Sequence, residues 1–136
     1  MRSQSPLVAT LAGTVLFVVL YVMGHELYSR TCLPATSLSC DAARNLLVAV
    51  IPASAGYTAG RLIGRHGVWY GALVGLVGVA LSGLIDSWRF EVPFIFASVG
   101  DIAVWVSLVV SQSVAMGFLA GGVGELRSRI VGSNEF

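Results

Sequence analysis

The sequence predicts an all-α integral membrane protein with four transmembrane helices. Three observations lead to this fold class: hydrophobic residues make up 56% of the 136 residues, charged residues make up only 11%, and the charges separate long apolar runs. An ordinary soluble domain has roughly 25% charged residues. A soluble fold of this size has too little interior to bury so much apolar surface, so we expect the chain to lie in lipid.

The first two apolar runs fit membrane spans, which need about 20 mostly apolar residues each. We expect the first helix over residues 5–26, where the run meets His25 and Glu26. This run is too long for the apolar part of a cleaved signal peptide, which has roughly 7–15 residues. We expect the second helix over residues 43–63, where the charge-free part is short unless Arg61 reaches the interface with its head group.

The third and fourth apolar runs also fit membrane spans. We expect the third helix over residues 67–86, ending at Asp86. Residues 92–124 are apolar except for Asp101. This stretch is too long for one straight span, so the fourth helix begins either near Val92 or near Asp101.

Charge asymmetry predicts the orientation. Four spans place both termini and the turn at 61–66 on one side of the membrane. The arginines of that side outnumber those of the other: Arg2, Arg61, Arg65, Arg127 and Arg129 against Arg30, Arg44 and Arg89. Positive charge collects on the cytoplasmic side. We therefore expect a bacterial inner membrane protein with both termini in the cytoplasm and outer loops at 27–42 and 87–100.

The two cysteines, Cys32 and Cys40, lie in the first outer loop. Outside a bacterial inner membrane the compartment is oxidising, so we expect a disulfide that acts as a structural link. The alternative is a membrane thiol oxidoreductase. It is disfavoured because four-helix enzymes of that kind use a close C-x-x-C pair plus further cysteines, and this chain has neither.

The second half of the sequence matches the first at several positions, which raises the question of an internal repeat. Glu26 aligns with Asp86, Asp41 with Asp101, and Gly56–Gly60 with Gly117–Gly121. Either a helical hairpin was duplicated, or the matches are chance agreements among common membrane residues. Duplication would give two tandem hairpins related by a pseudo-twofold axis along the membrane normal. The fourth helix would then cover residues 101–124.

Asp101 has two interpretations. An aspartate within a long apolar run is a candidate proton or cation carrier. Under the duplication it is instead the N-cap of the fourth helix, where a carboxylate accepts free backbone N–H groups and suits the positive end of the helix dipole. We favour the cap, and the depth of Asp101 in the bilayer decides between the two.

Glycines spaced by four predict the closest packing. They form three series, each on one helix face: Gly56, Gly60 and Gly64; Gly67, Gly71 and Gly75; Gly117 and Gly121. Small residues let helix backbones approach closely in lipid. We expect this glycine zipper to pack the second helix against the third. A glycine face would remain for a second copy of the chain or for another membrane protein.

The stretch from Ala55 to Gly78, AGYTAGRLIGRHGVWYGALVGLVG, carries many of these glycines together with the turn residues Arg61, Arg65 and His66. It resembles the glycine-rich hairpin of helices two and three in small uncharacterised bacterial four-helix membrane proteins. The resemblance implies the same topology and no particular activity.

Few polar residues are candidates for chemistry. A cation or proton could bind at four residues near the outer helix ends: His25, Glu26, Asp86 and Asp101. The simpler interpretation is that these residues only mark helix ends, which normally carry polar residues at the membrane interface. A polar patch in the fourth helix would line a pore or a polar cavity, or would hold helices together: Ser107, Ser111, Gln112 and Ser113. We assign no catalytic residue, cofactor or metal, because no nucleophile–base pair or complete ligand set can be placed.

We therefore expect a small polytopic protein that acts through helix–helix packing in the lipid bilayer, as an interaction subunit or a homo-oligomer. The alternative is an oligomeric channel or small transporter for a cation or proton. A membrane enzyme is disfavoured. The net charge of +1 argues against a nucleic-acid binder that works by neutralising phosphates.

Overall fold

The computed structural model describes residues 5–32, 37–89 and 99–133, and these ranges contain four helices. They are α1 (Pro6–Cys32), α2 (Leu38–Ile63), α3 (Gly67–Arg89) and α4 (Val99–Ser133). Each helix is long and apolar enough to cross a membrane. The all-α fold class with four such helices is therefore confirmed.

Several helices run further than the sequence predicted. Because α1 continues to Cys32 and α2 begins at Leu38, most of the loop expected at 27–42 is helical. Hydrophobicity marks where a helix leaves lipid, which is not where the helix ends. Arg30 and Glu26 form an ion pair one turn apart and extend α1 beyond its apolar part.

The ends of α3 and α4 also differ from the expected ones. α3 enters the loop expected at 87–100 as far as Arg89, and residues 90–98 lie outside the described part. α4 continues past 124, where we expected it to end, to Ser133. An ion pair between Arg129 and Glu125 supports this extension.

The first turns of α2 and α4 contain the aspartates that we expected to precede these helices. Ser37 is the N-cap of α2, and its hydroxyl accepts a hydrogen bond from the Cys40 backbone N–H at 3.3 Å, so Asp41 lies inside the first turn. α4 begins at Val99, so Asp101 also lies inside a first turn and the N-cap position expected for it is wrong. The side chain of Asp101 is outside the described part.

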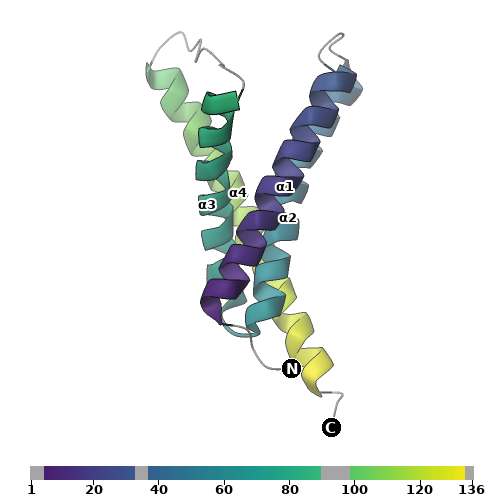
Figure 1. The fold of residues 1–136 in the computed structure, drawn as a ribbon, viewed down its shortest axis with the longest axis vertical. Helices are drawn as coiled ribbons and strands as arrows, with labels where there is room; N and C mark the ends of the chain where they lie inside the picture. Colours follow the sequence, from purple (N-terminus) through teal and green to yellow (C-terminus); the bar gives the residue numbers. More distant parts are fainter. Residues whose placement is uncertain (1–4, 33–36, 90–98, 134–136) are drawn as a thin grey trace.

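α2 and α3 form the centre of the bundle. They pack against each other, and each also packs against α1 and α4 (Figure 1). Among the described residues, α1 and α4 make no contact. The hairpins α1–α2 and α3–α4 are therefore packed unequally, and the duplication stays a prediction.

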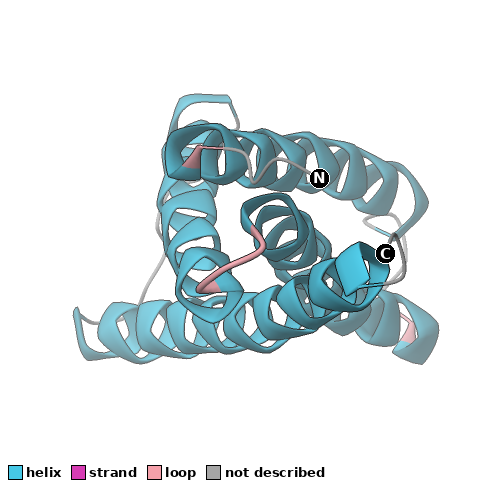
Figure 2. Ribbon diagram, turned by 90° about the horizontal axis from the view of Figure 1, so that it is seen from below, coloured by secondary structure: helices cyan, strands magenta, loops and turns pink. Residues whose placement is uncertain are grey.

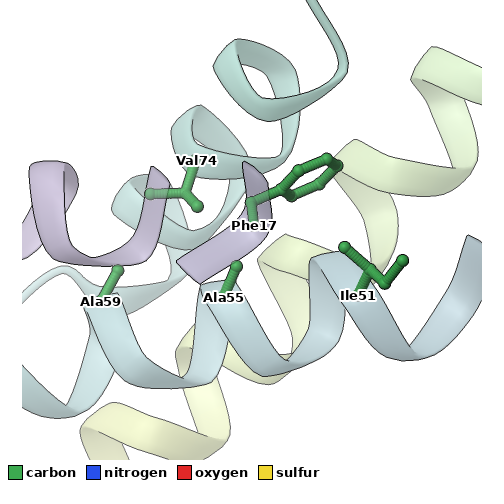
Figure 3. Close-up of a cluster of buried hydrophobic side chains, with 5 residues drawn as sticks. All are labelled: Phe17, Ile51, Ala55, Ala59 and Val74. Carbon is green, nitrogen blue, oxygen red and sulfur yellow. The ribbon is translucent and has the colours of Figure 1, made fainter. Parts of the chain in front are cut away.

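α1 packs onto the central pair through a small apolar core (Figure 3). Phe17 of α1 lies beside Ile51, Ala55 and Ala59 of α2 and Val74 of α3, and only 3% of Phe17 is exposed. The two alanines are fully buried and allow α1 to lie close to α2.

α4 packs against α2 and α3 through glycines that we call the glycine junction: Gly56, Gly60, Gly67, Gly71, Gly75, Gly117 and Gly121. A Cβ atom at Gly56 would lie 2.6 Å from the carbonyl oxygen of Gly117, and one at Gly67 would lie 2.5 Å from that of Gly121. We expected the glycine zipper to pack α2 against α3. The structure instead shows three helices in contact, because one face of α4 packs against both.

Gly64 has a different role from the helix packing that we expected for it. It ends α2 in a left-handed conformation with φ of 66°, and its N–H donates to the Gly60 carbonyl at 3.1 Å. Residues with a Cβ atom disfavour this conformation, whereas glycine adopts it without a steric cost. Gly64 therefore acts as a C-cap, and a Cβ there would meet only the Ser128 hydroxyl, at 3.5 Å.

The two ends of the bundle differ in shape. We call the end where α1 begins and α4 ends the terminal end, and the opposite end the loop end. α1, α2 and α3 converge toward the terminal end, where α4 crosses behind them and continues beyond, whereas α1 and α2 diverge from α3 and α4 toward the loop end (Figure 1). Figure 2 views the same helices from the terminal end. The convergence follows from the glycine junction, since Gly60 and Gly67 flank the turn at that end.

Candidate functional site

A carboxylate joins α1 to α3 in the loop-end half of the bundle. Asp86 is the last residue of the candidate span Gly67–Asp86. Its Oδ2 atom accepts a hydrogen bond from the Tyr21 hydroxyl at 2.5 Å. Its Oδ1 atom is buried and has no hydrogen-bond partner among the described residues.

Helical spacing places Tyr21 and Asp86 on facing sides of their helices. Tyr21 comes one turn after the core residue Phe17, and Asp86 one turn after Ser82, which is 8% exposed. His25 comes one turn further along α1, with its ring centroid 6.1 Å from that of Tyr21. We did not predict a role for Tyr21, although its spacing from Phe17 could have placed it on the core face.

Among the four candidate cation residues, Glu26 and Asp86 bind different partners. Glu26 forms an ion pair with Arg30 at 2.8 Å, whereas Asp86 binds Tyr21. The side chain of Asp101 is not described. Within the described ranges, no three His, Cys, Asp or Glu residues are placed to hold a metal ion.

Cys32 and Cys40 form the expected disulfide, with their sulfur atoms 2.10 Å apart. The bond joins the last residue of α1 to the first turn of α2, at the loop end. The sequence contains only these 2 cysteines. The bond therefore links α1 covalently to α2.

At the terminal end, Glu125 of α4 caps the start of α3. Its Oε2 atom accepts a hydrogen bond from the Gly67 backbone N–H at 2.7 Å, and its Oε1 atom pairs with Arg129. Only 12% of the Glu125 side chain is exposed. The first N–H groups of a helix lack partners within the helix and lie at the positive end of its dipole. The carboxylate therefore stabilises the start of α3 and fixes it to α4.

The polar patch of α4 divides between two faces. Ser113 is 2% exposed and packs against α3. Ser107 and Ser111 donate their hydroxyls to backbone carbonyls one turn earlier in α4. Gln112 is exposed and makes no hydrogen bond with any residue that the structure describes. The patch is therefore divided between a buried and an exposed face of α4, and the Gln112 amide has no partner among the described residues.

Gln112 lies on an exposed face of α4 beside four apolar residues. This face, which we call the outer stripe, consists of Leu108, Gln112, Ala115, Leu119 and Leu126. The three leucines are 65%, 62% and 61% exposed, in that order. Gly117 and Gly121, which contact α2 and α3, lie on the other side of α4, because helical spacing separates them from the stripe.

A shallow groove between α1 and α3 is apolar. It is lined by Leu11, Thr14, Val15, Val18, Val19 and Leu81, and its exposed lining carries no polar surface. Such a surface suits lipid chains and offers no ligand to an ion.

A scan of protein-family models, a search of curated proteins and a search of solved structures each give no match for this chain. The resemblance of the hairpin at 55–78 therefore stays a prediction.

Proposed function

We propose that this chain is a small multi-pass membrane protein that acts by binding another transmembrane helix along the outer stripe of α4. The unpaired, exposed amide of Gln112 is the observation that carries the proposal. We place the helices in a bacterial inner membrane. The terminal end would be cytoplasmic, because the turn and the termini hold most of the arginines.

We expect Gln112 to lie at mid-depth in such a membrane, and the packing of α4 against α3 supports this. Its neighbour Ser113 lies against Gly75, because a Cβ at Gly75 would overlap the Ser113 carbonyl. Gly75 is near the middle of the 20-residue span Gly67–Asp86. Gln112 would then lie in the hydrocarbon, far from both layers of head groups.

An amide in hydrocarbon without a hydrogen-bond partner costs several kcal/mol. Ser107 and Ser111 avoid this cost by donating to their own helix backbone. A second helix that offers a donor and an acceptor beside Gln112 would remove the cost. The leucines of the outer stripe would supply the packing around that contact.

The proposed contact does not use the glycine series. Gly56, Gly60 and Gly71 each face the backbone of α4 in the same chain. These faces are therefore already buried against neighbouring helices. The proposed contact lies on the opposite side of α4, where the side chains are large and exposed.

The proposal predicts protein contacts at the outer stripe in native membranes. A photoreactive residue in place of Leu119 should give a discrete protein adduct after illumination. Leu11 of α1 is 55% exposed, against 62% for Leu119, and is the matched control. Adducts from position 119 alone would support the proposal. No adduct there, or equal adducts at both positions, would contradict it.

Transport of a proton or cation is a second candidate function, and Asp86 is the observation in its favour. A buried carboxylate oxygen without a described partner could accept a proton or contact a cation at the loop end. The apolar groove and the divided polar patch argue against a continuous polar path through the described residues.

A flux assay separates this second candidate from the first. If Asp86 carries the ion, proteoliposomes should show proton or cation flux that Asp86→Asn removes. Glu26→Gln is the control, because Glu26 is already paired with Arg30. Vesicles that hold their gradient with the wild-type protein would exclude transport by this chain.

A further inference from the structure

We infer that the helix bound by the outer stripe is α4 of a second copy of this chain, in a parallel dimer in which the two Gln112 amides bind each other. The inference rests on the proposed function and names its partner. Three properties of the outer stripe lead to it: the spacing of its residues, the chemistry of the amide and the symmetry that a membrane imposes.

The spacing of the stripe is that of two helices wound around each other. Leu108, Gln112, Ala115 and Leu119 are separated by alternating steps of four and three residues, and Leu126 follows seven residues after Leu119. A repeat of about 3.5 residues keeps one seam facing a partner along the whole contact. Most helix pairs in membranes cross in this left-handed manner.

The chemistry of Gln112 favours a copy of itself. A glutamine amide carries an oxygen acceptor and two N–H donors. Two such amides can therefore satisfy each other, each donating to the oxygen of the other. A single polar residue within an apolar seam also fixes the register of the two helices.

Membrane insertion then brings the two amides to the same depth. Copies of one chain share one orientation in the bilayer, so a dimer has its twofold axis along the membrane normal. About such an axis each residue faces its own equivalent. Gln112 meets Gln112 at mid-depth, and a helix of another protein would need a polar residue at the same level.

The bundle leaves this face free. Gly117 and Gly121 contact α2 and α3 from the other side of α4, so a second copy can bind without opening the glycine junction. Ala115 lies one turn from Gln112 on the stripe and is small enough to let the two backbones approach.

The test measures self-association of the full chain in liposomes by energy transfer between donor-labelled and acceptor-labelled copies. We expect transfer that falls as lipid dilutes the protein. Gln112→Leu should raise the dimer dissociation constant about 3- to 30-fold. Asn45→Leu, which removes an exposed amide from α2, should leave the constant unchanged. The Cys32–Cys40 disulfide and the helical content of each variant report that it is folded.

Disulfide trapping locates the contact. Oxidation of an Ala115→Cys variant in membranes should give a covalent dimer, and Ala80→Cys, at an exposed alanine of α3, should not. Energy transfer that Gln112→Leu leaves intact, without trapping at position 115, would overturn the inference while leaving association itself supported. Adducts from position 119 without any energy transfer would also overturn the inference and leave the proposed function standing. Absence of adducts, transfer and trapping would overturn both.

Discussion

Replacing Gly71 by alanine is expected to destabilise the bundle by about 3 kcal/mol or more, at the upper end of the cost of overpacking. The added Cβ would overlap the carbonyl oxygen of Gly117 and lie 2.9 Å from the Cα of Gly121. The three nearest atoms all belong to backbone, so they cannot move away as a side chain could by rotating. α3 and α4 would have to separate along the glycine junction.

Gly83 provides the matched control in the same helix. A Cβ at Gly83 would have no described atom of another helix within 4 Å. Gly83→Ala should therefore leave the free energy of unfolding unchanged or raise it by about 0.5–1 kcal/mol through helix propensity. Unfolding of both variants in mild detergent, followed by helical content, gives the comparison. Equal stabilities for the two would show that the glycine junction is not closely packed.

Glu125→Ala is expected to cost about 1.5–3 kcal/mol, the range for a hydrogen bond to a charged group. The substitution removes the acceptor of the Gly67 N–H and leaves that group without a partner at the start of α3. The first turn of α3 and the turn at 64–66 should then open more often. Faster amide exchange in those residues, together with the lower stability, is the expected result.

Arg129→Ala separates capping from ion pairing. Arg129 binds the same carboxylate, but its side chain is 63% exposed. Exposed ion pairs one turn apart contribute about 0.3–0.5 kcal/mol. A loss in Arg129→Ala as large as that in Glu125→Ala would mean that the ion pair, and not the cap of α3, carries the effect.

The features that depend on composition or on neighbouring residues could be predicted from the sequence. Long uncharged runs predicted the four helices, and the presence of only 2 cysteines made their pairing a single choice. Helix ends were less accurate, because capping by Ser37 and the ion pair between Glu26 and Arg30 set them outside the apolar parts.

The partners of individual side chains could not be predicted from local pattern. Spacing placed Gly56 and Gly117 each on one helix face, but it could not show that α4 meets both α2 and α3. The contact between Tyr21 and Asp86 spans 65 positions, and that between Gly67 and Glu125 spans 58. Such pairs follow from the crossing of helices, which depends on the whole bundle.

The contacts of the polar patch of α4 could not be predicted from local pattern either. Its residues are neighbours in sequence, and their composition alone was compatible with a pore, a cavity or a helix contact. The structure buries Ser113 and exposes Gln112, because these adjacent residues lie on different faces of one helix. This separation moves the proposed binding surface from the glycines to the outer stripe.

We propose that the four helices cross a membrane and return the chain to the face from which it started. Reporters fused to both ends of the chain, probed with protease in right-side-out and inverted vesicles, test it most directly. Both reporters should be cleaved in inverted vesicles and protected in right-side-out ones. Cleavage of one reporter in each kind of vesicle would contradict an even number of crossings, and cleavage of both in each kind would contradict insertion.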